Sequence, residues 1–423
     1  MKIGIIGAGF GGLAAAHKLL KEGHEVIVLE AEKKPGGLAL GFKEKSWKWT
    51  IEAHYHHWFT NDYDVLELAK SVGQEVVTVK PKTSTYYDGE IKQLDSPLSL
   101  LQFSKLPFYE RIRTGIVLAH LKLTPFWQPL EKVTAKKFLI LSMGKTSWRV
   151  LWRPLFEKKF GEHSDSISAA WFWARIKKRT SSLSYPKGGF QSFADRLSKY
   201  ITDRGGVIVF NSPVESIVKV KGKLEVKANA NKYEFEKVIC TLPTPLFTKI
   251  TKGLPAAYKE SVVGLNAIGA INLVLSLKKP FLKDTSYWLN INELDYPFLA
   301  VVEHTNFMNK TNYNNKSIVY VGNYLPHDHR YFKSEAKELV EEFIPYLKKI
   351  SPGFTTSQIK KAYVFKAFYA QPIVPLNYSR ILPEFKTPIE GLYLCNMQQV
   401  YPWDRGTNYA VENGKKVASL ILQ

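Results

Sequence analysis

The residues best suited to chemistry lie at the start of the chain, where positions 7 to 12 follow the pattern G-x-G-x-x-G. The short apolar run 2–6 precedes this pattern, and the apolar stretch 13–20 follows it. A strand, a glycine turn and a helix in this order leave unpaired backbone amides where a pyrophosphate binds. We therefore predict a nucleotide-binding turn made by Gly7, Gly9, Phe10, Gly11 and Gly12.

A carboxylate follows the second strand of this unit. Gly23 ends the expected helix, residues 25–29 form a second apolar strand, and Glu30 follows the glycines by roughly 20 residues. An acid at this position binds a ribose hydroxyl and would repel a 2′-phosphate. A chance glycine turn is the alternative, but the flanking strands, helix and acid favour a site for the ADP half of a dinucleotide.

Three histidines in four positions form a second group, within the run His54-Tyr55-His56-His57-Trp58-Phe59. Imidazoles suit a proton shuttle near neutral pH or an anion-binding site, and buried structural histidines are the alternative. A metal site is disfavoured because no nearby cysteine or carboxylate pair completes the ligands. We predict His56 and His57 as catalytic-site residues.

A third group is Trp171, Arg175 and Arg179, with Lys178 beside them. Their spacing of four residues places them on one face of a helix. Two guanidiniums there would bind a carboxylate or a diphosphate. The alternative is a solvated basic face with Trp171 packed beneath it. We predict Arg175 as a catalytic-site residue.

These groups require a scaffold with more than one core. At 423 residues, with 45% hydrophobic side chains, the chain is expected to form two domains. Cys240 and Cys395 lie in separate apolar runs, which argues against a disulfide framework and favours a reducing cytoplasm. The sequence shows no signal peptide pattern and no apolar stretch long enough to span a bilayer.

Strand-like and helical patterns then alternate along the chain. Residues 81–186 are predicted to form a helical cap with two proline-punctuated helical stretches, and residues 268–325 to form an antiparallel sheet. Further strands are predicted at 207–210, 214–220, 224–227, 238–241, 362–368 and 392–396. Helices are predicted at 334–349 and 407–422.

Three further segments agree with the opening unit. An acid and a glycine pair occur in 30–37, a Pro-Lys-Gly-Gly turn in 185–190, and an Arg-Gly-Thr-Asn helix start in 405–414. Together they resemble the superfamily of FAD-dependent amine oxidases, protoporphyrinogen oxidases and phytoene desaturases, with UDP-galactopyranose mutases as relatives. The resemblance involves both ends and the middle of the chain.

This resemblance implies an α/β fold with two domains. The first is a Rossmann-like FAD-binding domain of the glutathione-reductase, p-hydroxybenzoate-hydroxylase-like type, expected over 1–80, 187–250 and 385–423. The second is an α+β substrate domain of antiparallel sheet and helical cap, expected over 81–186 and 251–384. Besides the glycine turn and Glu30, the implied FAD contacts are Ala31, Gly36, Gly37, Val214, Asn396, Gly406, Thr407 and Asn408.

Some positions depart from the family pattern. Asn396-Met397 stands where the family usually has Gly-Asp, so either Asn396 or Asp404 is expected to replace the usual carboxylate. No cysteine motif for covalent attachment is present, which implies non-covalent FAD. Tyr369 and Gln371 resemble a family segment that enters the flavin site, and Tyr369 is a further catalytic candidate. The run 303–306 is a weaker substrate-site candidate.

The resemblance implies an FAD-dependent oxidoreductase that takes a hydride from an amine, a porphyrinogen-like ring or an isoprenoid. No second dinucleotide fingerprint is present, which favours an outside electron acceptor. The main alternative is a non-redox mutase acting on a nucleotide sugar, in which the cap arginines bind the diphosphate. A non-catalytic FAD-binding protein is the third possibility.

The net charge of +21 bears on the partners. It favours acidic small molecules or anionic lipid, although lysines on solvated faces are the simple alternative. No nucleic-acid-binding signature occurs, so the expected partner is a small-molecule substrate, anionic or apolar. Residues 98–127 mix large apolar side chains with Lys and Arg, which suits peripheral docking on an anionic membrane; an ordinary cap is the alternative. The protein is therefore expected in the cytoplasm or at the inner face of the membrane.

Overall fold

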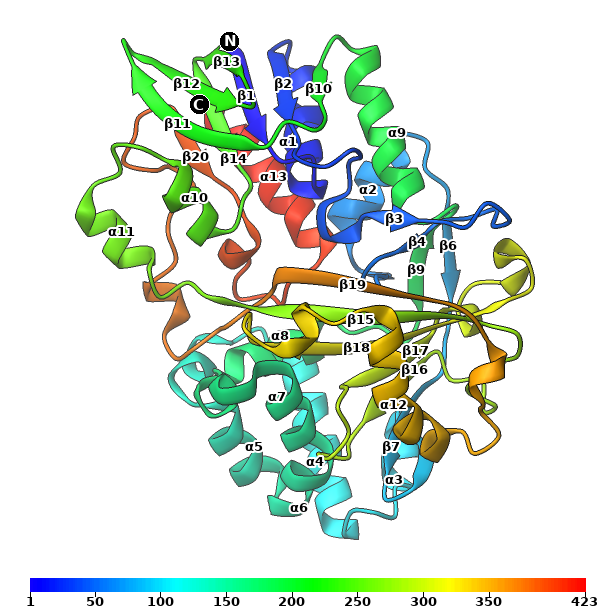
Figure 1. Cartoon of the computed structure of the whole chain (residues 1–423). Helices are drawn as coiled ribbons and strands as arrows, with labels where there is room; N and C mark the ends of the chain where they lie inside the picture. Colours follow the sequence, from blue (N-terminus) through cyan, green and yellow to red (C-terminus); the bar gives the residue numbers. More distant parts are fainter.

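A parallel sheet of five strands occupies the end of the molecule that carries both termini (Figure 1). The structure is a computed structural model that describes residues 1–423. The sheet contains, in spatial order, β10 (Val207–Val209), β2 (Glu25–Leu29), β1 (Lys2–Ile6), β14 (Lys237–Cys240) and β20 (Leu392–Leu394). Its strands come from four separate parts of the sequence. This arrangement confirms the predicted α/β class.

Alternate side chains of these strands pack on two different layers. On one face, Ile3 and Ile5 share a core with α1 (Phe10–Lys21), α9 (Phe190–Asp203) and α13 (Thr407–Ile421). On the other face, Ile6 and Leu29 pack against a three-stranded sheet. That sheet contains β11 (Val214–Val220), β12 (Lys223–Ala228) and β13 (Asn231–Phe235). Helices α10 (Thr244–Ile250) and α11 (Ala256–Val262) follow it in the chain.

A second large sheet of seven strands forms the middle of the molecule (Figure 1). Its strands, in spatial order, are β19 (Ile359–Pro372), β15 (Ala267–Leu277), β18 (Ser317–Leu325), β17 (Ala300–Glu303), β16 (Trp288–Ile291), β7 (Thr83–Tyr87) and β8 (Glu90–Gln93). All neighbours pair antiparallel except β16 and β7. Helix α12 (Ala336–Ile350) packs on one face through Leu339, Phe343 and Leu347, which recur every four residues.

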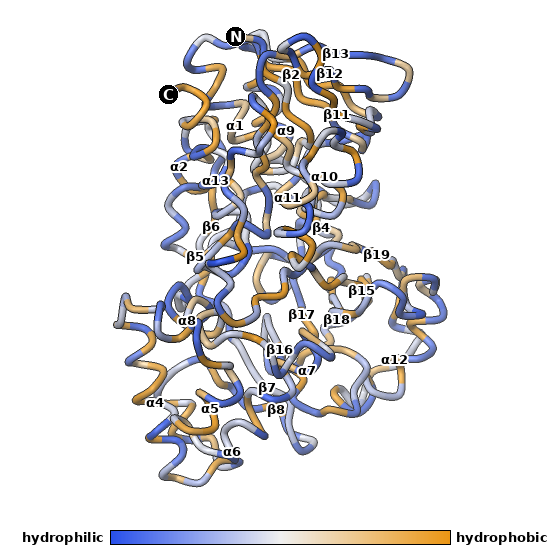
Figure 2. Tube along the Cα trace, turned by 90° about the vertical axis from the view of Figure 1, so that its left-hand side faces the viewer, coloured by the Kyte–Doolittle hydropathy of each residue, from blue (hydrophilic) through white to orange (hydrophobic).

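Residues 81–186 differ from the predicted cap of two helical stretches. They begin with the β7–β8 hairpin, because Thr83 to Tyr87 is a β-branched and aromatic run that pairs with β16. Helices follow at α3 (Pro97–Leu101), α4 (Phe108–Leu123), α5 (Ala135–Met143), α6 (Lys145–Ser147), α7 (Arg153–Phe160) and α8 (Ala169–Lys178). Of these helices, α4, α5 and α6 form the end of the molecule opposite to both termini (Figure 2).

Short elements connect the two large sheets. Strands β5 (Trp58–Phe59), β9 (Leu183–Pro186) and β6 (Val76–Val79) form one small sheet, and β3 (Gly41–Phe42) pairs with β4 (Ile51–Glu52). Helix α2 (Tyr63–Ser71) lies beside α13. Cys240 and Cys395 are buried and free. No helix combines the length and apolar character that crossing a bilayer requires.

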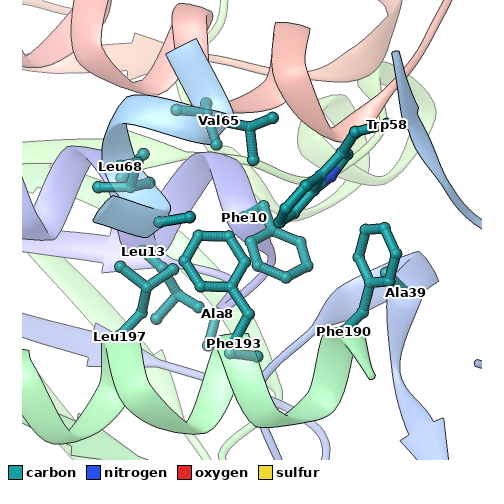
Figure 3. Packing of buried hydrophobic residues seen from close by; sticks show 14 of the residues in the cluster. Ala8, Phe10, Leu13, Ala39, Trp58, Val65, Leu68, Phe190, Phe193 and Leu197 are labelled. Atoms are coloured by element: carbon teal, nitrogen blue, oxygen red, sulfur yellow. The ribbon is translucent and has the colours of Figure 1, made fainter. Parts of the chain in front are cut away.

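Aromatic side chains fix the junction between these elements (Figure 3). Phe10 of α1 stacks on Phe193 of α9 with ring centroids 5.1 Å apart. Trp58 of β5 packs edge-on against Phe190 at 5.1 Å and against Phe193 at 5.5 Å. The same four rings therefore hold the glycine turn, the histidine segment and α9 in one core.

Candidate functional site

The glycine turn joins β1 to α1 at the carboxyl edge of the parallel sheet. The Gly7 amide donates a hydrogen bond to the Leu29 carbonyl (2.8 Å), and Gly7 has a φ of 101°. A Cβ on Gly12 would lie only 2.0 Å from the Gly7 carbonyl oxygen, so the helix packs directly on the turn. The first amides of α1 have no partner within the helix. They are available to an anion at this edge.

Two of the predicted contacts in this turn have additional packing roles. The Phe10 side chain is 4% exposed and belongs to the aromatic core, so only its backbone can contact a nucleotide. A Cβ on Gly11 would lie 3.2 Å from the Ala410 carbonyl oxygen, which shows how closely α1 approaches α13.

Glu30 ends β2 beside the turn and is buried. Its Oε2 accepts a hydrogen bond from the Ala8 amide (2.6 Å), and its Oε1 accepts one from the Glu32 amide (2.8 Å). The exposed Ala31 lies between the two acids. The Ser212 amide bonds to the Glu30 carbonyl (2.8 Å), which brings the start of β11, with the half-buried Val214, to the same edge.

The glycine pair Gly36 and Gly37 lies against the turn. The Gly36 amide donates to the Ala8 carbonyl (2.9 Å), and both glycines have positive φ, at 134° and 57°. A Cβ on Gly37 would lie 3.2 Å from the Gly9 Cα. Two stretches of backbone without side chains therefore run side by side at the carboxyl edge of the sheet.

These features fit the ADP half of FAD. Free amides at a helix N-terminus bind a pyrophosphate, and the fixed Glu30 carboxylate suits a ribose. The bare backbone of Gly9 and Gly37 leaves room that any side chain would fill.

The N-terminus of α13 lies on the other side of this region. Thr407 Oγ1 accepts a hydrogen bond from Trp58 Nε1 (2.7 Å), and Asn408 Oδ1 accepts one from the Val65 amide (3.1 Å). Gly406 precedes them with extended backbone. The partial positive charge of this helix end thus faces the region next to the histidine segment.

Asn396 and Asp404 have different roles in the structure. Asn396 Nδ2 donates to the Leu242 carbonyl (3.0 Å), and its Oδ1 accepts from the Gln398 amide (3.0 Å). These bonds hold the loop after β20. Of the two alternatives considered for the missing family carboxylate, only Asp404 lines the cavity described next.

A cavity of about 170 Å³ lies where the parallel sheet, the seven-stranded sheet and the cap meet. It is bounded by the histidine segment, α7, α8, β16, β18 and the start of α13. Its aromatic walls are Tyr55, Phe59, Trp288, Tyr324 and Tyr409. Its charged lining residues are Asp62, Lys159, Arg175, Asp404 and Arg405. The predicted residues His56, His57, Arg175, Gly406, Thr407 and Asn408 all meet here.

The histidines of this cavity are neutral at pH 7. Burial lowers the pKa of His56 to about 4 and that of His57 to about 3. His56 Nδ1 lies 2.6 Å from the His54 carbonyl oxygen, so Nδ1 carries the hydrogen and Nε2 is an acceptor. These pKa values do not favour the predicted anion binding by the histidines, because neutral imidazoles carry no positive charge. No group of three or more side chains in the structure has the arrangement of a metal site.

Two cations of the cavity have no hydrogen-bond or ion-pair partner. Lys159 is 4% exposed, and its Nζ lies 4.2 Å from the centre of the Tyr324 ring. Burial lowers the pKa of Lys159 to about 8. The Arg175 guanidinium lies over the Trp171 ring at 5.8 Å. By contrast, the neighbouring Lys158 Nζ donates to the Phe298 carbonyl (3.0 Å).

Arg179 does not line the cavity with Lys159 and Arg175. Helix α8 ends at Lys178, and Arg179 has extended backbone with φ −60° and ψ 130°. Its charge nevertheless helps, after burial, to lower the pKa of His57. The expectation of two arginines on one helical face is therefore wrong, because the helix ends one residue too early.

A third cation, Arg405, is paired within the protein. Its Nε donates to Gln371 Oε1 (2.7 Å), and its guanidinium donates to the Tyr324 hydroxyl. Burial opposes ionisation of Tyr324, but the charges of Arg405 and Lys159 outweigh burial and lower the pKa of this phenol. Asp404 Oδ1 accepts from Trp171 Nε1 (2.9 Å) and from the Arg405 amide (3.0 Å).

Asp62 is the remaining charged group of the cavity. Its Oδ2 accepts from the Phe59 amide (2.8 Å), whereas its Oδ1 has no partner. The Tyr409 hydroxyl, which also belongs to a cavity-lining residue, is likewise unpartnered. Burial raises the pKa of Asp62 to about 6, so it carries less than a full negative charge near neutral pH. The cavity therefore has an excess of positive charge.

The structure does not bring Tyr369 to this cavity. Its ring lies beside His327, with centroids 5.3 Å apart, whereas Gln371 two residues later reaches Arg405. Tyr369 is therefore corrected from a catalytic candidate to a residue outside the site. Glu303 is also structural, because its carboxylate accepts from the Leu282 amide (2.6 Å) in the sheet core.

Sequence reasoning missed Lys159, Trp288 and Tyr324. One signal existed for the lysine: Leu155, Phe156, Lys159 and Phe160 lie on one helical face, and a lysine on an apolar stripe is unusual. Trp288 and Tyr324 carry no such signal. They reach the cavity only because β16 and β18 belong to the same sheet.

Comparison with known proteins agrees with this architecture. A family model described as flavin-containing amine oxidoreductase matches residues 10–422. Zeta-carotene desaturase of Capsicum annuum is 29% identical over 239 residues, which span 49% of this chain and only 40% of that protein. Flavin-containing amine oxidase B of Homo sapiens is 22% identical over 456 residues, 99% of this chain and 85% of its own length.

Solved structures share the fold. A putative protoporphyrinogen oxidase from Exiguobacterium sp. 255-15 has a TM-score of 0.78 at 17% identity, covering 99% of this chain and 98% of its own. Reduced UDP-galactopyranose mutase has a TM-score of 0.79 at 16% identity, covering 100% and 95%. At such identities the likeness concerns the fold alone.

Proposed function

Because this chain belongs to the family of flavin-containing amine oxidoreductases, we propose that it is an FAD-dependent oxidoreductase whose substrate carries an anionic group on an apolar or aromatic body. The cofactor is FAD, and bound FAD supplies two-electron redox chemistry. The glycine turn and Glu30 would hold its ADP half. The pair Gly36–Gly37 and the amides at the start of α13 would hold the flavin side.

The observation that carries the proposed substrate class is the pair of unpartnered cations. Lys159 and Arg175 line the cavity without internal partners, while Arg405 is hydrogen-bonded to Gln371 and Tyr324. A buried charge is costly unless a partner compensates it. An anionic substrate group would supply that partner.

The other walls would orient the rest of the substrate. Tyr55 and Trp288 pack edge to face, with centroids 4.9 Å apart, and Trp288 Nε1 is held by Asn290 Oδ1 at 2.9 Å. Fixed aromatic rings bind a flat or apolar body and exclude water. Neutral His56 presents an acceptor nitrogen and adds no charge.

A binding experiment tests this substrate class without knowledge of the natural substrate. Benzoate and the neutral benzamide are titrated into the holoenzyme, and perturbation of the flavin absorption spectrum is recorded. We expect benzoate to bind and benzamide to bind much more weakly. Lys159→Met should weaken benzoate binding roughly tenfold or more, because a charge-assisted contact is lost.

Lys158→Met is the matched control. Lys158 is the preceding residue of α7 and is half-buried, but it bonds to backbone carbonyls and does not line the cavity. It should leave benzoate binding unchanged. Equal binding of benzoate and benzamide would contradict the proposed anionic substrate class. A change of the flavin spectrum with UDP-sugars but not with benzoate would favour the mutase alternative.

A further inference from the structure

Residues 98–141 of the cap carry many exposed apolar side chains, and helices α4 and α5 of this segment lie at the end of the molecule farthest from the termini (Figure 2). Nine of the nineteen exposed large hydrophobic residues of the chain fall within residues 98–141. They are Leu98, Leu101, Phe108, Tyr109, Ile112, Ile116, Leu123, Phe126 and Leu141. We call them the cap face.

On this face, helix α4 exposes a stripe of apolar side chains to solvent. Its exposed side chains Phe108, Ile112 and Ile116 recur every four residues, with exposed fractions of 67%, 39% and 64%. Its buried side includes Glu110 and Thr114, at 3% and 0%. An ordinary surface helix turns its apolar stripe toward the core. Here one apolar stripe faces solvent, while Leu121 and the half-buried Val117 and Leu118 pack inward on the cap core.

Internal hydrogen bonds explain how the polar side is accommodated. The Glu110 carboxylate accepts from the Ser147 amide (2.6 Å) and from the Thr146 amide (3.3 Å). Thr114 Oγ1 lies 2.7 Å from Ser147 Oγ. The orientation of α4 is therefore held by specific contacts with α6.

The segment that carries the cap face has an excess of positive charge, although Asp88, Glu90 and Asp165 from neighbouring segments pair with its Lys105 and Lys136. Residues 96–150 contain nine Lys and Arg but only two acids, Glu110 and Glu131. Both acids are buried, and Glu131 accepts from the Tyr401 hydroxyl (2.8 Å). No carboxylate of this segment is therefore exposed, while Arg113 and Lys122 are exposed on α4 itself.

We propose that the cap face docks on the surface of an anionic lipid bilayer, with α4 lying in the plane of the interface. Apolar side chains would enter the headgroup region, and the surrounding cations would meet lipid phosphates. The excess of positive charge in this segment favours this occupant over a second copy of the chain, because a symmetric dimer would bring like charges together.

Flotation with vesicles tests the proposal on the holoenzyme. Phosphatidylcholine vesicles are compared with vesicles that also contain phosphatidylglycerol, at low and at high salt. We expect binding to the anionic vesicles that weakens at high salt. The variant Phe108→Ser/Ile116→Ser should lose roughly tenfold or more of this partitioning, since two apolar side chains no longer enter the lipid.

Val263→Ser/Leu294→Ser is the matched control, because both residues are exposed but lie outside the cap face. It should bind vesicles like the original protein, and all variants should retain their flavin spectrum. Equal loss in the control, or no binding to anionic vesicles at low salt, would overturn the proposal. So would a dimer in size-exclusion chromatography that Phe108→Ser/Ile116→Ser dissociates, if no vesicle binding accompanies it.

Discussion

At the scale of single residues, the buried Lys159 lowers the free energy of unfolding at pH 7. Its pKa of about 8 lies below the ordinary 10.5 because the side chain is buried without a partner. At pH 7 the ammonium is charged in both states, and folding must desolvate it. Between pH 8 and 10.5 the unfolded chain binds more protons than the folded one, so this penalty disappears as pH rises through that window.

Lys159→Met should therefore stabilise the ligand-free holoenzyme at pH 7, on the order of 3 kcal/mol. The gain should shrink as pH rises from 8 toward 10.5. Differential scanning fluorimetry across pH measures it. In the proposed-function assay, benzoate binding to the unmutated protein should also weaken as pH rises through about 8, where the ammonium loses its proton. A lower Tm for Lys159→Met at pH 7 would contradict this account.

At the scale of elements, the approach of α1 to α13 positions the cofactor site. A Cβ on Gly414 would lie 2.2 Å from the Gly11 carbonyl oxygen, which is backbone and cannot move aside. This contact sets the place of α13, and with it the hydrogen bond from Trp58 to Thr407.

Gly414→Ala should push α13 away from α1, cost roughly 1–3 kcal/mol of stability and weaken FAD retention. The ratio of flavin to protein absorbance after purification and the Tm report both effects. Gly264→Ala is the control, because nothing lies within 4 Å of its added Cβ. Full flavin content in Gly414→Ala would show that the two helices can separate without harm.

At the scale of the whole molecule, segments from both ends of the chain build one cofactor site. The turn at Gly7, Glu30 and the start of α13 at Thr407 come from distant parts of the sequence and meet at one sheet edge. A ligand that binds only this assembled form stabilises it by mass action.

Removal of FAD should therefore lower the Tm of the entire chain, and added FAD should restore it. FMN should restore much less, because it lacks the adenylate part that the glycine turn and Glu30 would recognise. Thermal melts of the apoprotein with each flavin measure the difference. If FMN raised the Tm as much as FAD does, the glycine turn and Glu30 would not bind the adenylate part of the cofactor.

The local pattern of the sequence determined the parallel-sheet unit and its cofactor. A strand, Gly7 to Gly12, a helix and Glu30 are contiguous, so this pattern is visible in the local sequence, although Gly11 also approaches Ala410 at the far end of the chain. The strands β11, β14 and β20 were likewise predicted from short apolar runs. The β7–β8 hairpin was not predicted, although Asp88-Gly89, with positive φ at both residues, is a local signal for its turn. Its place beside β16 depends on residues some two hundred positions away.

Only the tertiary structure decided which groups share the cavity and what charge they carry. The sequence marks Arg179 and Tyr369 as clearly as Arg175, but neither lines the cavity: α8 ends before Arg179, and the Tyr369 ring packs beside His327. Lys159 and Tyr324 enter from a cap helix and a central strand. Burial then makes His56 and His57 neutral and leaves Lys159 without a partner, because desolvation depends on every layer around a side chain rather than on its neighbours in sequence.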